Sequence, residues 1–234
     1  MPTFKDKGLV LREVETAENS KRLLLLTQGR GRIWAFARGA AGVKSKLKAP
    51  KMTFCEFVLY DGGQFLSLAQ VAQIRAFPNL VGDFDAYCIA NFLLEAVDRM
   101  LLPAMPADEA LKLILLTFAR LDGGCDPWLV FSAGTFKLLQ QEGFVPITDN
   151  CSGCGDKFPG KYFFAVDGIT CQNCGGLAFS DEARLALEYI LEAPLAKIFN
   201  FKASPDVLMG LKTAALMFFS HHVDVELKSM AFIK

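Results

Sequence analysis

Apolar blocks and turn-forming residues alternate over the first 80 positions of the chain. The blocks are rich in branched and aromatic residues, and Gly, Pro, Asn and Asp punctuate the stretches between them, a pattern typical of short β-strands. The predicted strands cover residues 9–14, 22–27, 32–38, 54–60 and 65–69. Five short strands joined by long loops predict a small barrel of the OB-fold type, although the strand number also fits other small barrels.

From position 81 onward, apolar residues recur at spacings of three and four, as Ile89, Phe92 and Leu93 do. This spacing collects them on one helical face. Asp83 can cap the first turn and Pro103 ends the run, so a helix is expected between them. Further helices are predicted over about 108–121 and about 127–142, from 180 onward, and from 204 toward 222.

Two Cys-x-x-Cys pairs stand close together in the second half of the chain. They are Cys151 with Cys154 and Cys171 with Cys174, with 16 residues between the pairs. Segments 161–166 and 169–170 predict a hairpin that brings the pairs together, and the spacing is typical of a four-cysteine Zn²⁺ site. Four thiolates fill a tetrahedral shell, so we expect one structural ion per chain. Two redox dithiols are the alternative.

These elements predict an α+β multi-domain protein. An N-terminal five-stranded OB-fold barrel would occupy residues 1–80, and a helical domain carrying a four-cysteine zinc module would follow. The helical domain would run over 81–148 and 177–234, with the zinc module inserted at 149–176.

Few residues suit catalysis. The chain has two histidines, His221 and His222, which are adjacent; they form either a surface feature or an extra ligand pair. No phosphate-binding Gly-x-x-x-x-Gly-Lys loop and no Gly-x-Ser-x-Gly elbow occurs. The remaining cysteines, Cys55, Cys88 and Cys125, are predicted to be small buried apolar residues. We therefore expect a protein that is not an enzyme.

Charge is distributed unevenly along a neutral chain. There are 25 basic and 25 acidic residues, but residues 1–80 carry a net charge of +7, residues 81–150 carry −6 and residues 151–234 carry −1. The 22 residues from Arg30 to Lys51 contain seven basic side chains and no acidic one. A polyanion would meet a positive surface on the N-terminal domain.

The predicted strand 32–38 carries aromatic and basic residues on one face. Its two-residue period places Trp34 and Phe36 between two arginines. Rings that stack on bases beside cations that bind phosphates suit single-stranded nucleic acid, although both rings would instead fill the barrel core if the face were reversed. The candidate DNA-binding residues are Arg30, Arg32, Trp34, Phe36, Arg38, Lys44, Lys46, Lys48 and Lys51.

Targeting signals are not evident in the sequence. The N-terminal residues include charges that are not followed by an apolar run, and the apolar runs elsewhere are far shorter than the roughly 18 to 20 residues of a membrane span. We expect a cytoplasmic protein.

Ten short segments follow one another along most of the chain in a characteristic order. They are LREV at 11–14, ENS at 18–20, LLLLT at 23–27, GRI at 31–33, ARGA at 37–40, KSKL at 44–47, LL at 138–139, GFVP at 143–146, CSGCG at 151–155 and LKSMAF at 227–232. In this order they resemble the RecO family of bacterial DNA repair and recombination-mediator proteins. The chain departs from the family pattern shortly before Leu138, where an aromatic residue followed by an acid is expected but the chain has Gly134-Thr135 and then Phe136-Lys137.

The resemblance implies more than the pattern alone. It implies binding of single-stranded and double-stranded DNA, annealing of complementary strands, and help in loading a recombinase onto strands coated by single-stranded DNA-binding protein. Implied partners are RecR, the C-terminal tail of the single-stranded DNA-binding protein and, indirectly, RecA, in the nucleoid-associated cytoplasm of a bacterium. The sequence is also compatible with two other hypotheses: a scaffold whose basic surface binds an acidic partner tail, and a nucleic-acid enzyme with a zinc ribbon.

Overall fold

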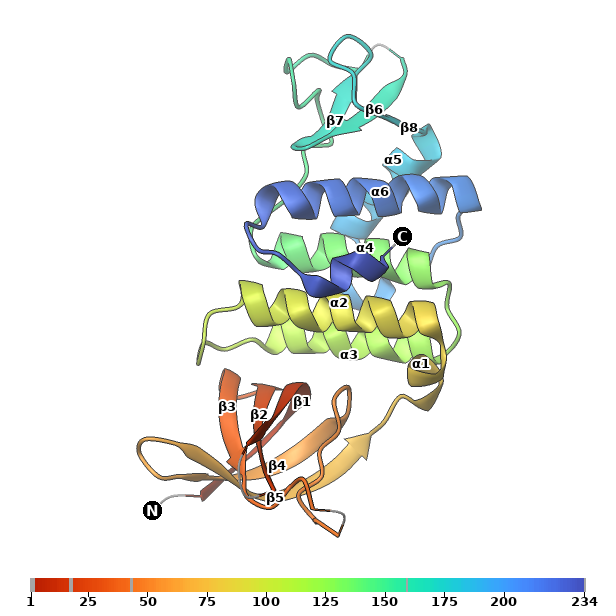
Figure 1. Cartoon of the computed structure of the whole chain (residues 1–234). Coiled ribbons are helices and arrows are strands. Elements are labelled where there is room, and N and C mark those ends of the chain that lie inside the picture. The colour runs from red at the N-terminus through yellow and green to blue at the C-terminus, as the bar shows by residue number, and fades with distance from the viewer. Residues whose placement is uncertain (1–2, 17–18, 43, 159, 234) are drawn as a thin grey trace. The chain divides into compact units, whose positions relative to one another are not determined.

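The computed structural model describes residues 3–16, 19–42, 44–158 and 160–233. Positions 17 and 18, between the first two predicted strands, and position 43, in the basic segment, lie outside the described residues. The chain forms two compact units, Met1–Ala119 and Arg120–Lys234, shown in Figure 1. Among the described residues, no helix combines the length and apolar character needed to cross a membrane.

The first unit begins with a closed five-stranded barrel. Its strands are β1 (Thr3–Thr16), β2 (Ser20–Thr27), β3 (Gly31–Ala37), β4 (Phe54–Asp61) and β5 (Leu66–Arg75). They close in the order β1-β2-β3-β5-β4, with β3 and β5 parallel and the other paired strands antiparallel. The predicted OB-fold-like barrel is thus confirmed.

Strands β1 and β5 are longer than predicted. The first residues of β1 alternate in exposure and pair with β4 from Thr3 opposite Tyr60 to Leu9 opposite Phe54. At the other edge of β4, β5 continues to Arg75. The extensions contain polar residues between their apolar ones, are mostly exposed, and pair through their backbones, so no continuous apolar block marks them in the sequence.

The side chains in the barrel core show which face of β3 points inward. Ile33, Ala35 and Ala37 lie in the buried apolar cluster inside the barrel, whereas Trp34 and Phe36 are half-buried on its outer surface. The alternation predicted from the sequence is confirmed, and the possibility that the two rings fill the core is excluded.

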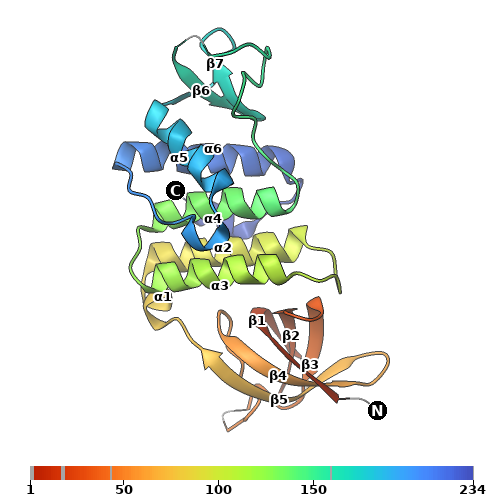
Figure 2. The same cartoon turned by 180° about the vertical axis from the view of Figure 1, so that it is seen from behind.

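Three helices complete the first unit: α1 (Pro78–Gly82), α2 (Phe84–Met100) and α3 (Asp108–Asp122), the last ending just beyond the unit's boundary. Asp83 caps α2 by accepting a hydrogen bond of 2.8 Å from the amide of Ala86. Figures 1 and 2 show α2 and α3 side by side. The two longer helices confirm the prediction, while the short helix α1 was not expected.

The second unit combines helices with a small sheet. Its helices are α4 (Pro127–Gln141), α5 (Asp181–Glu192) and α6 (Pro205–His222), with short 3-10 turns at Leu195–Lys197 and Lys228–Phe232. The sheet has the order β7-β6-β8 and is built from β6 (Tyr162–Ala165), β7 (Gly168–Cys171) and β8 (Leu177–Phe179). The predicted helices and the β6–β7 hairpin are confirmed, and β8 is additional.

A chain of phenylalanine rings joins the small sheet to the helices. Phe164 of β6 lies 5.4 Å from Phe179 of β8, 6.2 Å from Phe136 of α4 and 6.4 Å from Phe218 of α6, between ring centroids. All four rings are buried. The module that carries the cysteines is therefore packed onto the helices of its own unit.

Lys137, where the chain departs from the family pattern, has a defined role in this packing. Its ammonium donates hydrogen bonds to the carbonyls of Leu191 at 2.9 Å, Ala193 at 3.1 Å and Ile190 at 3.3 Å. These carbonyls lie at the C-terminal end of α5, where helix carbonyls lack intrahelical partners and attract cations. Lys137 of α4 thus caps α5.

Candidate nucleic-acid interface and metal centre

The outer face of the barrel carries a tryptophan flanked by two arginines. β1, β2 and β3 place Arg12, Arg22 and Trp34 side by side, with the guanidinium carbons of Arg12 and Arg22 5.2 Å and 4.8 Å from the indole centroid. Such cation–π contacts fix the planes of all three groups. Phe36 lies further along the same face of β3. Aromatic and cationic groups therefore adjoin on this surface, but the arginines beside Trp34 come from the neighbouring strands and were missed by the sequence analysis, which considered β3 alone.

Arg32 has a partner within its own unit. Its guanidinium donates a hydrogen bond of 2.8 Å to the Asp98 carboxylate of α2 and a second to the backbone carbonyl of Asp98. The two side chains are 18% and 13% exposed. Asp98 also lies 3.5 Å from Arg12. A contact between residues 66 positions apart leaves no local sequence signal, so the prediction treated Arg32 as open to a ligand.

Lys51 is likewise engaged by neighbours. Its ammonium donates a hydrogen bond to the side-chain carbonyl of Asn91 on α2, and its backbone amide donates to the carboxylate of Glu13 at 2.9 Å. Burial lowers the pKa of Lys51, against the opposing influence of Glu95. The lysine at the end of the basic segment therefore anchors the connection between β3 and β4.

That connection displays a row of cations. The exposed side chains are Arg38, Lys44, Lys46 and Lys48. Between them, Leu47 packs against the barrel core and Ala49 belongs to it. The amide of Gly39 donates to the hydroxyl of Ser20 at 3.1 Å. Because the apolar residues point inward, the lysines point outward. None of the ion pairs formed by the described residues includes Arg38, Lys44 or Lys46.

Arg30 lies at the opposite end of β3. It is exposed, and its guanidinium carbon lies 3.8 Å from the ring centroid of Phe4. Arg30 and Arg38 flank the seven residues of β3 and are eight residue steps apart, which at ~3.3 Å per residue is about 26 Å. The basic segment that is continuous in sequence is thus divided between two ends of the barrel surface.

The four predicted cysteine ligands form one cluster. Their Sγ atoms all lie within 4.8 Å of one another, and those of Cys154 and Cys171 are 3.8 Å apart. All four are free thiols. A tetrahedral ion with Zn–S bonds of about 2.3 Å requires sulfur atoms about 3.8 Å apart. The donor set therefore fits a tetrahedral metal ion, and the thiols do not form two separate pairs.

Tight turns hold the sulfur atoms in place. The amide of Cys171 donates to Cys151 Sγ at 3.2 Å, and the amide of Gly155 donates to the Cys151 carbonyl at 2.8 Å. A Cβ atom on Gly153 would lie 3.0 Å from Cys174 Sγ. Gly155 has a φ of +81°, in the region that favours glycine. The glycines permit the close approach of the two knuckles.

The thiols differ in their readiness to ionise. Burial raises the pKa of Cys151, but hydrogen bonds from backbone amides, that of Cys171 foremost, outweigh it and lower the pKa to about 6. Hydrogen bonds with the other three thiols raise the pKa of Cys174 to about 12. Four thiolates at these distances require a cation to neutralise them, so the cluster can hold a metal ion.

The two histidines form a second polar cluster with Asp167. One ligand atom from each of Asp167, His221 and His222 lies within 4.8 Å of the others. His222 Nε2 lies 3.6 Å from the Asp167 carboxylate and 3.0 Å from the Val166 carbonyl, and its ring packs 4.2 Å from Phe218. The end of α6 is thereby attached to the β6–β7 turn.

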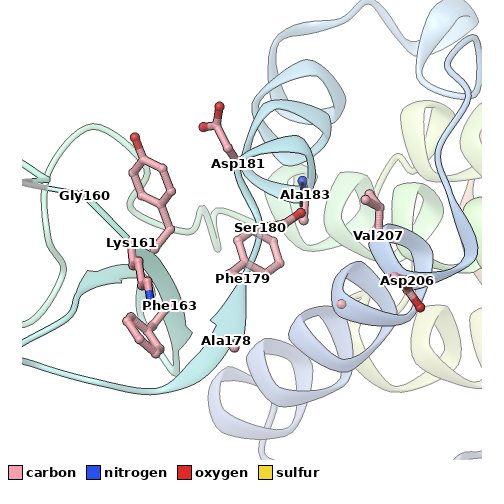
Figure 3. Close-up of a pocket in the computed structure, with 12 residues that line it drawn as sticks. Gly160, Lys161, Phe163, Ala178, Phe179, Ser180, Asp181, Ala183, Asp206 and Val207 are labelled. Carbon is pink, nitrogen blue, oxygen red and sulfur yellow. Dashed lines mark hydrogen bonds between the residues drawn. The ribbon is translucent and has the colours of Figure 1, made fainter.

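An apolar pocket of about 670 Å³ lies beside the small sheet. Figure 3 shows Lys161, just before β6, and Phe163 of β6 on one side, with Asp181 at the start of α5 and Asp206 at the start of α6 on the other. Because two carboxylates and one ammonium line the pocket, its charge does not favour a polyanion.

Known proteins resemble the chain along its full length. Residues 1–77 match the family described as Recombination protein O N terminal, and residues 81–231 match the one described as Recombination protein O C terminal. Proteins named DNA repair protein RecO are similar. The one from Acetivibrio thermocellus is 28% identical over 100% of this chain and 97% of its own length. The one from Desulfitobacterium hafniense is 32% identical over 74% of this chain and 65% of its own length. Together with the barrel, the helices and the cysteine cluster, these matches show that the chain belongs to the RecO family.

Proposed function

We propose that this protein is a non-enzymatic, DNA-binding mediator of recombinational repair of the RecF-pathway type. It binds single-stranded and double-stranded DNA, anneals complementary strands, and assists the loading of a recombinase on strands coated by single-stranded DNA-binding protein. The observation that carries the proposal is the row of exposed cations on the barrel, of which Arg38, Lys44 and Lys46 form no ion pair with any described residue. The names of the relatives, DNA repair protein RecO, support it.

In this proposal the barrel holds DNA mainly through its phosphates. Arg38, Lys44, Lys46 and Lys48 contact phosphates at one end of β3, and Arg30 does so at the other. Arg32 and Lys51 act indirectly, because their side chains hold the strand and the loop in place. Trp34 and Phe36 offer rings to unpaired bases. Cations that bind phosphates without reading bases suit a protein that must act on any damaged sequence.

The partners in this proposal are RecR, the C-terminal tail of the single-stranded DNA-binding protein and, through them, RecA. A protein that works on coated strands meets all three at a gap or break, in the bacterial cytoplasm. The support is family membership.

We also propose that the cysteine cluster holds one Zn²⁺ per chain in a structural role. Cys151, Cys154, Cys171 and Cys174 would occupy all four positions of a tetrahedral shell, which leaves none for water or substrate. When bound, the ion cross-links the two knuckles and neutralises their thiolates. The surrounding hairpin packs on α4 and α6 through Phe164, so the ion stabilises the second unit.

The decisive experiment is annealing of complementary oligonucleotides that are first coated with single-stranded DNA-binding protein, measured by a fluorescent dye specific for duplex in the absence of ATP. The mediator proposal predicts annealing well above the rate of the coated strands alone. A rate equal to that of the coated strands alone overturns the proposal.

A charge-reversal variant tests the interface itself. Replacing Arg38, Lys44 and Lys46 with Glu should weaken binding to single strands by orders of magnitude and reduce the salt slope, which is about 0.7 per phosphate contact. The matched control replaces Lys157, Lys197 and Lys202, exposed lysines of the second unit, and changes the net charge equally. Equal losses in both variants would show that net charge, not the barrel, binds DNA.

The same variants separate the mediator from a scaffold that binds an acidic tail. A scaffold predicts that the barrel variant loses binding to an acidic tail peptide and that neither wild type nor variant anneals strands above the rate of the coated strands alone. A mediator predicts that wild type anneals the strands and that the barrel variant does not.

A further inference from the structure

A cavity of about 380 Å³ opens at the Arg30 end of the barrel. The turn between β2 and β3, the loop between β4 and β5, and the connection between α2 and α3 surround it, all within the first unit. Its lining includes Gly29, Arg30, Asp61, Gln64 and Phe65. The cavity is thus bordered by an aromatic ring, a guanidinium group and groups able to form hydrogen bonds.

Phe65 is exposed by a well-defined turn. Its side chain is 72% exposed, the largest value among the exposed large apolar residues that the structure describes. The amide of Gly62 donates to the Phe65 carbonyl at 3.1 Å, and the amide of Gly63 donates to the Asp61 carboxylate at 2.9 Å. Two hydrogen bonds within this turn hold the backbone that presents Phe65 at the cavity, where the apolar surface of its ring remains in contact with water.

Arg30 is held on the facing turn. Its guanidinium lies 3.8 Å from the Phe4 ring, and its amide donates to the Thr27 hydroxyl at 3.3 Å. The carboxylate of Asp6 accepts a hydrogen bond of 3.0 Å from the amide of Gly29. In the part of the chain that the structure describes, Arg30 belongs to no ion pair, so its charge is available to a ligand.

We propose that this cavity receives one unstacked base of a DNA single strand, which stacks on the Phe65 ring while Arg30 contacts an adjacent phosphate. Every base offers a flat face to an aromatic ring, so such a site tolerates any sequence. Bases of a duplex are already stacked on one another and cannot enter. The site therefore distinguishes single strands from duplexes, a distinction that phosphate contacts alone make poorly. This inference rests on the proposed DNA-binding function.

The test compares wild-type protein with Phe65→Ala on a single strand and on the matching duplex. Loss of one stacked base should weaken single-strand binding about 5- to 150-fold and leave duplex binding unchanged. Because Phe65 is exposed, both proteins should unfold at the same temperature. Ile74→Ala is the control: Ile74 is 48% exposed on β5, lies outside the cavity lining, and should bind as wild type does.

Two further measurements identify the base as the group bound. A strand with abasic sites should bind wild type and Phe65→Ala equally, because the stacking partner is missing from both complexes. Phe65→Trp should restore affinity, and its added fluorescence should be quenched by a single strand and not by a duplex.

The outcomes separate this inference from the proposed function. If wild type binds neither single strands nor duplexes, both the base site and the proposed DNA-binding function are overturned. If wild type binds single strands and Phe65→Ala binds them equally well, the base site alone is overturned. Equal losses on single strand and duplex also overturn it, as does a Phe65→Ala defect that persists on the abasic strand, which would indicate a contact with the backbone.

Discussion

The guanidinium of Arg32 in β3 and the carboxylate of Asp98 in α2 form a hydrogen-bonded ion pair of 2.8 Å that connects the barrel to the helix following it. Both side chains are largely buried. The backbone carbonyl of Asp98 accepts a second hydrogen bond from the same nitrogen. Arg32, a basic residue of a strand predicted to bind DNA, thus forms its ion pair with a residue of its own unit.

Breaking this pair should destabilise the protein. Asp98→Ala leaves the Arg32 charge partly buried beside a missing partner, and should lower the free energy of unfolding by about 2 kcal/mol. Chemical denaturation followed by circular dichroism measures the loss. Arg32→Gln should destabilise similarly, whereas Arg38→Gln should leave stability unchanged and weaken DNA binding. If Arg32→Gln weakens DNA binding with no change in stability, Arg32 contacts DNA directly.

Removing a cysteine should remove the metal. Freshly purified wild-type protein should contain one zinc ion per chain by elemental analysis, and Cys171→Ala should contain less than about a tenth of an equivalent, because three thiolates bind zinc far more weakly. Hydrogen exchange should accelerate over residues 151–174. Cys125→Ala, which alters a thiol outside the cluster, should keep its zinc. Wild-type protein with less than a tenth of an equivalent would contradict the zinc assignment.

Lys137→Met should destabilise the second unit. Met has a similar length, but it leaves the carbonyls of Leu191 and Ala193 without their ammonium donor at the end of α5. The expected loss is about 1–2 kcal/mol, from lost hydrogen bonds and helix capping. Thermal unfolding measures it. Lys197→Met, which removes an exposed lysine of the same unit, should have little effect. Equal stability of Lys137→Met and wild type would show that water replaces the lysine fully.

The same lysine predicts a dependence on pH. Burial lowers the pKa of Lys137 below its ordinary value of 10.5. The folded protein therefore releases this proton at a lower pH than the unfolded chain does, and between the two pKa values the unfolded state binds more protons. Stability then rises with pH. The stability of wild type minus that of Lys137→Met should grow as pH rises from neutral toward 10.5. A difference that shrinks would mean that the hydrogen bonds of the ammonium with the carbonyls at the end of α5 outweigh the effect of its burial.

Gly31→Ala should be strongly destabilising. Gly31 has a φ of +61°, and a Cβ atom there would lie 1.7 Å from the carbonyl oxygen of Met105. The expected loss is about 1–3 kcal/mol, because the connection after α2 would have to move. Gly39→Ala is the control, since its φ is +66° but no atom lies within 4 Å of the new Cβ. Unfolding in denaturant measures both variants. If Gly31→Ala and Gly39→Ala lower the free energy of unfolding equally, the effect comes from backbone strain and not from the contact with Met105.

The sequence predicted those features that repeat locally. Alternation along β3 places Ile33 and Trp34 on opposite faces, although only the barrel core shows that the Ile33 face is the inner one. The cysteine spacing alone predicts the cluster. The caps at Asp83 and Ser180 marked where helices begin. Each of these signals lies within a few residues of the element that it specifies.

Features that depend on distant contacts were not predictable in this way. Nothing near Arg32 reveals that Asp98 is its partner, and nothing near Lys137 reveals the end of α5. The sequence pattern places Phe65 at the start of a strand. Only the turn before β5 in the structure shows that its ring is exposed at a cavity. The exposed ring has an identifiable sequence signal in retrospect, a bulky aromatic directly after Asp61-Gly-Gly-Gln64.

Because the cations are divided between the two ends of β3, DNA affinity should depend on the length of the oligonucleotide. A separation of about 26 Å corresponds to roughly eight base pairs of duplex, at one phosphate per ~3.4 Å along each strand. A duplex of about five base pairs can engage Arg30 or the loop after Arg38, but not both. Affinity should then increase in a step, and not smoothly, once the DNA fragment is long enough to reach both ends of β3.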